Sequence, residues 1–223
     1  MLIATPTYNA QVYAAFSHSL ADTIRAAGPN LDVRDYYPLG KTHCSARNDC
    51  VAQAINNGFD DLVFIDADQS WNWKDFYRLL SYPVDVVGAP VRKKADNPER
   101  YNVYVPKGPE TFDEDRATGL WTAPGMTVGT GYLRLSRKAL VALWSNAEAY
   151  REPDGTECRW IYDIHPMDGD LVSEDVVVGH KLLECGFQTW LAPHMRVAHH
   201  DGMKIYTGDF VDFTRRLIAE RAK

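Results

Sequence analysis

The chain has 223 residues, a length that suits one domain or two closely fused ones. Thirty acidic against 24 basic residues give a formal charge of −6, which offers no global attraction to nucleic acid or to an anionic membrane. Hydrophobic residues make up 45% and charged residues 24%, the balance of a globular protein, so bulk disorder is excluded.

The sequence carries no membrane or secretion signal. No apolar run approaches the roughly 18 residues that a membrane helix needs. The opening MLIATPTYNA lacks the basic and apolar regions of a signal peptide. The four cysteines, Cys44, Cys50, Cys158 and Cys185, form no CxxC pair. We therefore expect a cytoplasmic protein with reduced thiols.

The first 91 residues alternate between short apolar runs and amphipathic stretches. Strands are expected at the opening LIATPTY run, 31–33, 62–65 and 84–91, and helices over 10–27, 46–57 (capped by Ser45) and 74–81. The run at 62–65 is bounded by acids, which is typical of a central parallel strand buried on both faces. This alternation predicts an α/β fold, in which a mainly parallel sheet is flanked by helices.

The second half has a different character. Residues 92–127 are polar and rich in Pro and Gly, and they are expected to form long loops with one hairpin. Irregular, aromatic residues 150–170 could form an acceptor wall or an ordinary surface insertion. Further strands are expected at 128–136, 187–191 and 195–199, and helices over 137–145, 174–185 (capped by Ser173) and the last 14 or so residues.

Two acids, Asp66 and Asp68, directly follow the predicted central strand. In open α/β sheets ligands bind at the carboxyl ends of the strands, so both carboxylates are expected to face one opening there. They repel each other unless a cation lies between them, and a hard divalent cation suits oxygen ligands. The alternative is an ordinary pair of loop acids, one of them capping the next element and the other solvated.

Three more positions admit both a functional and an ordinary interpretation. Arg47, at the start of a helix, could meet a base or a phosphate, or form a surface salt bridge. Glu174 and Asp175 lie in the first turn of a helix, where acids compensate the helix dipole and where one could act as a general base. His199 and His200 follow a short strand, and a neutral imidazole is a good ligand for Mn²⁺, although most single histidines bind no metal.

In this chain order, these segments resemble the GT-A fold of nucleotide-sugar-dependent glycosyltransferases. The resemblance covers nearly the whole chain and is closest to small family-2-like enzymes, including viral, phage-type and bacterial ones. It rests on TPTYNA, ARND, LVFIDAD, VGTGYLRLS, SEDVVVGHKLLECGFQTWLAP and VAHH. It implies one GT-A domain over residues 1–223, with a nucleotide-binding half at 1–91 and an acceptor-side half with mobile loops at 92–223. A viral relative would work in the host cytoplasm.

The resemblance also implies roles for the residues at matching positions. In such enzymes the first strand-end loop and the ARN arginine hold the nucleotide, and the first DxD acid meets the ribose or the metal. The second DxD acid and the last histidine hold a divalent metal, Mn²⁺ or alternatively Mg²⁺. The ED pair supplies the base in inverting members. The implied residues are Thr5, Pro6, Thr7, Arg47 and Asp66 for the nucleotide; Asp66, Asp68 and His199 for the metal; Asp175, with Glu174 beside it, for catalysis; and Gly129 and Gly131 for the donor or acceptor pocket. The two Trp residues in QSWNWKDF depart from the family pattern: both could belong to the core, or one, Trp71, could stack on a sugar in the donor or acceptor pocket.

The function implied is metal-dependent transfer of a sugar from a nucleotide-sugar donor, a UDP-sugar by base rate, to an acceptor hydroxyl with inversion. A divalent ion would neutralise the diphosphate and stabilise it as a leaving group. Retaining chemistry stays open, because the fold does not fix the stereochemistry. The acceptor also stays open among a glycan, a lipid-linked sugar, a protein side chain and a hydroxylated DNA base.

Three other functions are weighed against this one. A non-catalytic module could bind a sugar nucleotide or a partner protein, although the retained acids and histidine argue against lost catalysis. A sugar-phosphate nucleotidyltransferase would need a Gly-rich, basic phosphate loop near the N-terminus, which TPTYNAQ lacks. A zinc hydrolase built from His194, His199 and His200 would lack the usual helical HExxH spacing.

Overall fold

The computed structural model describes residues 1–29, 31–167 and 169–222. Its centre is an eight-stranded sheet in the order β2-β1-β3-β10-β5-β15-β8-β7. The strands β2, β1, β3, β5 and β15 run in one direction, and β10 runs antiparallel between β3 and β5. The predicted mixed, mainly parallel sheet is therefore confirmed. The strands are β1 Leu2–Ala4, β2 Arg34–Tyr36, β3 Asp61–Ile65, β5 Val86–Gly88, β7 Asp113–Asp115, β8 Leu120–Thr122, β10 Tyr132–Ser136 and β15 Trp190–Leu191.

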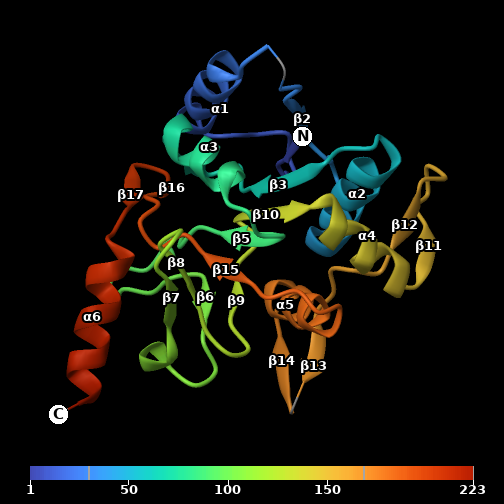
Figure 1. Ribbon diagram of the computed structural model, residues 1–223. Coiled ribbons are helices and arrows are strands. Elements are labelled where there is room, and N and C mark those ends of the chain that lie inside the picture. The colour runs from blue at the N-terminus through green and yellow to red at the C-terminus, as the bar shows by residue number, and fades with distance from the viewer. Residues whose placement is uncertain (30, 168, 223) are drawn as a thin grey trace.

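Helices cover both faces of this sheet (Figure 1). Because side chains alternate along a strand, Ile3 and Val63 pack against α1 and α3 on one face. Leu2 and Phe64 belong to the opposite core, which α2, α4 and α5 cover. The helices are α1 Ala14–Ala26, α2 His43–Asn56, α3 Trp73–Ser81, α4 Arg137–Asn146, α5 Glu174–Glu184 and α6 Phe210–Arg221. None of the helices within the described residues is both long and apolar enough to cross a membrane.

Smaller sheets surround this centre. In one of them β16 pairs with both β4 and β17, which sets His199 opposite Gln69, the residue after Asp68 in the chain. A third apolar core lies between α6 and the segments around β6 and β9, and it includes Tyr101 and Phe210. The remaining elements are β4 Gln69–Ser70, β6 Val103–Tyr104, η1 Pro109–Thr111, β9 Thr127–Val128, β11 Ala149–Arg151, β12 Glu157–Arg159, β13 His165–Met167, β14 Asp170–Val172, β16 Ala198–Asp201 and β17 Lys204–Tyr206.

Several predicted boundaries are wrong. The second strand lies at 34–36 instead of 31–33, because it is there that the chain pairs with β1. The first helix begins at Ala14, since residues 5–13 form the loop that follows β1, and α2 begins at His43 after Thr42 rather than after Ser45. The predicted strand 128–136 is broken at 129–131, because β9 pairs with β6 whereas β10 pairs with β3. The irregular 150–170 stretch contributes to two hairpins.

Candidate functional site

A cleft of about 890 Å³ opens at the carboxyl ends of the parallel strands β1 and β3. It is lined by residues 6–13, which follow β1, by residues 66–68, which follow β3, and by His43 from the start of α2. Its volume falls within the range of small-molecule sites. The position agrees with the rule that open α/β sheets bind ligands at their carboxyl edge.

The loop after β1 supplies Pro6 and Thr7 to this cleft, whereas Thr5 lies buried beneath it. The amide of Thr5 donates to the carbonyl of Tyr36 at 2.9 Å, which continues the β1–β2 pairing. The hydroxyl of Thr7 donates to the carbonyl of Gln11 at 3.1 Å and so closes the loop on itself. These bonds give the cleft a fixed wall.

Arg47 is a buried cation behind the cleft, with only 2% of its side chain exposed. Its Nη2 lies 3.1 Å from Oδ1 of Asp66, and its guanidinium carbon lies 5.3 Å from the centroid of the Phe64 ring. Burial opposes the charge, but Asp66 and the neighbouring acids raise the pKa of Arg47. Arg47 therefore reaches the cleft through Asp66 and does not line it.

The two glycines of the GTG segment make room for side chains of the protein itself. A Cβ atom at Gly131 would lie 2.7 Å from Oδ2 of Asp66 and 2.6 Å from Nε2 of Gln69. A Cβ atom at Gly129 would lie 2.8 Å from Cβ of Asn102. Gly131 thus allows the carboxylate of Asp66 to lie against the start of β10.

Asp68 belongs to a separate charged group at the rim of the cleft. Its Oδ2 lies 2.5 Å from Nζ of Lys94 and 3.4 Å from Nε2 of His199. Burial disfavours the carboxylate, but these two partners lower the pKa of Asp68 to about 2. Burial likewise disfavours the imidazolium, yet Asp68 and the carbonyl of Arg92 raise the pKa of His199.

The chemistry of this group fits a divalent cation. Oδ1 of Asp68 is buried and has no hydrogen-bond partner among the described residues. Nδ1 of His199 lies 2.9 Å from the carbonyl oxygen of Arg92, which can only accept, so in the neutral ring Nε2 carries the lone pair. The Lys94 ammonium pairs with the other oxygen of this carboxylate, Oδ2, so Oδ1 is the oxygen that is left for a cation.

The group is incomplete as a metal centre. Within residues 1–29, 31–167 and 169–222, no three His, Cys, Asp or Glu side chains are arranged to hold a metal ion. Asp66 faces Arg47, while Asp68 faces His199. A metal held by Asp68 and His199 would therefore need oxygen atoms from a ligand to complete its coordination shell.

The two acids at the start of α5 have different surroundings. The amide of Thr130 donates to Oδ1 of Asp175 at 2.9 Å, and the Thr130 hydroxyl donates to the same oxygen. Oε1 of Glu174 lies 2.8 Å from Nε2 of His43. Burial disfavours the Glu174 carboxylate, but His43 and Arg47 lower the pKa of this group. Asp175 is thus held by Thr130, which precedes β10, and Glu174 is held by His43 of α2.

His43, Lys94 and Thr130 are site residues that do not figure in the predicted set. His43 precedes Arg47 by one helical turn, so both side chains lie on one face of α2, and this spacing could have indicated His43. Lys94 occurs in a basic run that has no distinctive pattern. Thr130 lies between the two glycines and gives no separate signal.

Two predicted groups lie away from the cleft. Trp71 is 7% exposed, its indole N–H donates to Oγ1 of Thr23 at 3.0 Å, and its ring packs edge-on against Phe16. Trp71 is thus part of the core and does not line the cleft. Nε2 of His200 lies 2.8 Å from Oγ of Ser70, and His194 is exposed, so the proposed zinc triad does not converge.

Comparison with solved structures decides the fold. The protein A197 from STIV matches with a TM-score of 0.54 and 15% sequence identity, over 92% of this chain and 92% of that one. The structure of GalNAc-T7 with UDP, GalNAc and Mn²⁺ matches over 89% of this chain, with a TM-score of 0.52 and 10% identity. The chain has a GT-A fold. It spans 43% of the GalNAc-T7 chain, so the likeness concerns the GT-A core.

The likeness is one of fold and does not identify a glycosyltransferase family. No family model matches the sequence, and no curated protein sequence matches it. Within the GT-A fold of this chain, Arg47 connects Asp66 in the cleft with Glu174 at the start of α5, and Asp68 in the same cleft contacts His199.

Proposed function

We propose that the protein is a metal-dependent glycosyltransferase that moves a sugar from a nucleotide-sugar donor, a UDP-sugar, to an acceptor hydroxyl. The observation that carries this proposal is the Asp68–His199 pair, in which a buried, unpartnered carboxylate oxygen lies beside an imidazole at the rim of the cleft. The structure of GalNAc-T7 with UDP and Mn²⁺ supports the choice of donor and metal.

The donor's nucleotide would lie in the cleft along residues 5–7, with Asp66 held toward its ribose by Arg47. The loop that carries Pro6 and Thr7 is closed by a hydrogen bond of its own, so little conformational entropy would be lost when the nucleotide binds. Gly131 keeps the Asp66 carboxylate in this position.

Asp68 and His199 would hold the divalent ion, Mn²⁺ or Mg²⁺. When bound, the ion would stabilise the diphosphate leaving group as a Lewis acid. Lys94 would add positive charge beside the same carboxylate, which suits a diphosphate bound by an otherwise acidic protein.

Asp175 would serve as the general base of an inverting transfer. Thr130 holds one of its oxygens, and no hydrogen bond to Oδ2 occurs within the described part of the chain. Oδ2 is therefore the atom that would accept the proton of the acceptor hydroxyl. Glu174, which contacts His43 and Arg47 of α2, would hold the start of α5 in place against α2.

The experiment measures nucleoside diphosphate released from a panel of nucleotide sugars with Mn²⁺, Mg²⁺ or EDTA. We expect metal-dependent release from one donor, lost in Asp68→Ala. The matched control is Asp96→Ala, because Asp96 also pairs with a lysine, at 2.7 Å, but is exposed and does not line the cleft. Donor binding without release, measured by thermal shift, would favour a non-catalytic module. Absence of binding by every donor would contradict the proposal.

A further inference from the structure

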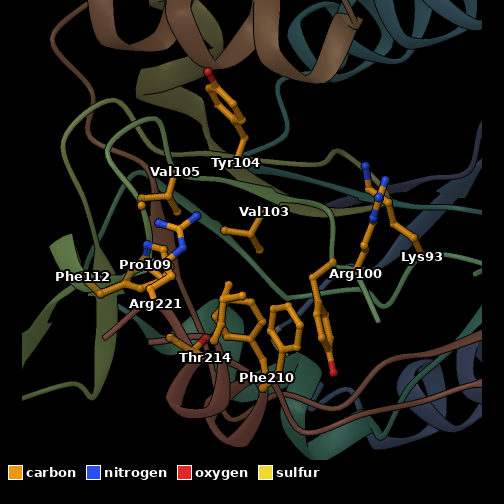
Figure 2. Close-up of a pocket in the computed structure, with 14 residues that line it drawn as sticks. Lys93, Arg100, Val103, Tyr104, Val105, Pro109, Phe112, Phe210, Thr214 and Arg221 are labelled. Carbon is orange, nitrogen blue, oxygen red and sulfur yellow. The ribbon is translucent and has the colours of Figure 1, made fainter. Parts of the chain in front are cut away.

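A second cavity, of about 290 Å³, lies between α6 and the segment from residue 93 to residue 112 (Figure 2). Its floor is aromatic: the Tyr101 ring lies 5.1 Å from that of Phe210 and 5.0 Å from that of Phe213. Aliphatic side chains complete its walls, among them Val103, Val105 and Leu217. The cavity is close to the lower limit of small-molecule sites, so it suits one short apolar chain.

Three cations surround this apolar cavity. Figure 2 shows Lys93 and Arg100 on one side and Arg221 on the other, beside Pro109. Arg221 is paired with Glu110 at 3.3 Å. Neither Lys93 nor Arg100 has an ion-pair partner among the residues that the structure describes. Two uncompensated cations at an apolar cavity, in a protein whose formal charge is −6, favour a ligand with an anionic group.

The cavity shares a wall with the candidate active site. The backbone amide of Lys93 donates to the backbone carbonyl of Arg100 at 2.8 Å, so the two basic residues are neighbours at the rim of the cavity. The residues on either side of Lys93 do not line the cavity. The carbonyl of Arg92 contacts His199, and the side chain of Lys94 contacts Asp68. The segment 92–94 therefore faces the Asp68 group with two of its residues and the cavity with the third.

We propose that this cavity binds an apolar chain that ends in a phosphate, with the chain on Tyr101, Phe210 and Phe213 and the phosphate at Lys93 and Arg100. Guanidinium groups bind phosphate oxygens in pairs, and a phosphate dianion matches two cations. The phosphate of such an amphiphile would bind Lys93, whose neighbour Lys94 contacts Asp68 of the proposed metal site. The amphiphile would then lie on the acceptor side of the transfer. Only this last assignment rests on the proposed function.

The test uses octyl phosphate below its micelle concentration, with octanol and inorganic phosphate as partial ligands, in isothermal titration of the full chain without donor or metal. We expect saturable binding of octyl phosphate. Octanol should bind about tenfold more weakly, because it lacks the charge-assisted contacts. Inorganic phosphate alone should not bind in the same range.

Two variants separate a built site from general stickiness. Arg100→Gln should weaken octyl phosphate binding about tenfold and leave octanol unchanged. Arg215→Gln is the matched control, since Arg215 lies exposed on α6, pairs with Asp212 at 3.2 Å and does not line the cavity. Both residues are exposed, so both variants should fold.

The proposal is overturned if octyl phosphate shows no saturable binding, if octanol binds equally well, or if Arg100→Gln binds like the wild type. Because this assay contains neither donor nor metal, its failure leaves the transferase proposal untouched. Equally, an absence of donor turnover would leave the octyl phosphate result standing.

Discussion

At the scale of single residues, Arg47 shows how one buried cation organises the site. It contacts Asp66, lies 3.9 Å from Glu174 and donates to the carbonyl of Thr130 at 3.4 Å. These three partners follow β3, open α5 and precede β10, so Arg47 joins the elements that frame the cleft. Burial of a charge carries a desolvation penalty in the free energy of folding, and these partners offset that penalty.

Replacement of this cation should be severe. We expect Arg47→Met to lower the free energy of unfolding by about 3–5 kcal/mol, because it removes the cation from the buried Glu174 and the partly buried Asp66. Arg25→Met is the control, since Arg25 is 73% exposed and pairs with Asp22 on the surface of α1, where a pair contributes about 0–1 kcal/mol. Urea unfolding measures both, and similar losses in the two variants would contradict this role of Arg47.

Gly131 makes a second prediction at this scale. A methyl group there would push against the Asp66 carboxylate and disturb its pairing with Arg47. We expect Gly131→Ala to lower the free energy of unfolding by about 1–3 kcal/mol and to weaken donor binding. At Gly28 a Cβ would meet nothing within 4 Å, so Gly28→Ala should be neutral for donor binding. Unchanged unfolding and donor binding in Gly131→Ala would refute the argument.

Glu174 should make stability depend on pH. Burial opposes its charge, but His43 and Arg47 hold the pKa of Glu174 below its ordinary value of 4.5. Ionised Glu174 therefore stabilises the fold above that value, and the contribution is lost as the pH falls through the lower folded-state pKa. The difference in unfolding free energy between wild type and Glu174→Gln should shrink between about pH 5 and pH 3. A difference that stays constant over this range would exclude the effect.

At the scale of elements, local sequence patterns predicted the helices and strands that have a local signal. They did not predict elements whose limits are set by pairing with a strand that is distant in the sequence. The apolar run at 62–65 and the acids that follow it predicted a buried strand with carboxylates at its end, and β3 ends as expected before Asp66. Ser136 caps α4 by accepting from the amide of Ala139, although no cap was predicted there. Ser173, the predicted cap of the helix over 174–185, precedes α5 but makes no side-chain capping bond.

The site itself depended on pairings that leave no local signal. β4 has two residues, and only its pairing with β16 places His199 next to Asp68. The alternation at 128–136 predicted one strand, because a pattern of period two cannot show that β9 and β10 pair with different partners. The sequence left both a core position and stacking on a sugar open for Trp71, and its burial and its bond to Thr23 of α1 decide for the core.

The break between β9 and β10 gives the prediction at this scale. It places Thr130 where both its amide and its hydroxyl reach Asp175. Thr130→Val removes only the hydroxyl bond, so we expect a loss of about 1 kcal/mol in stability and a fall in kcat with little change in KM for the donor. Thr118→Val, which loses a hydroxyl bond to Asp115 and lines neither the cleft nor the cavity under α6, should keep its kcat. Equal kcat values in the two variants would contradict a positioning role for Thr130.

At the scale of the whole molecule, the GT-A fold gathers groups that are far apart in the sequence. The cleft comes from the first 70 residues, whereas His199 and Asp175 come from the last 50. The segment 92–94 lies between this centre and the apolar cavity under α6. Under the two proposals, a protein of net charge −6 holds Lys93, Lys94 and Arg100 where anionic ligands would bind.

The central claim is that Asp68 and His199 hold a divalent ion together with a nucleotide, and Mn²⁺ binding followed by electron paramagnetic resonance tests it most directly. Titration of the protein with Mn²⁺ in the presence of UDP should remove the signal of the free ion. Asp68→Asn and His199→Ala should each weaken this binding at least about tenfold. His194→Ala, which alters an exposed histidine, should not. Mn²⁺ affinity in the two site variants equal to that of the wild type would contradict the account.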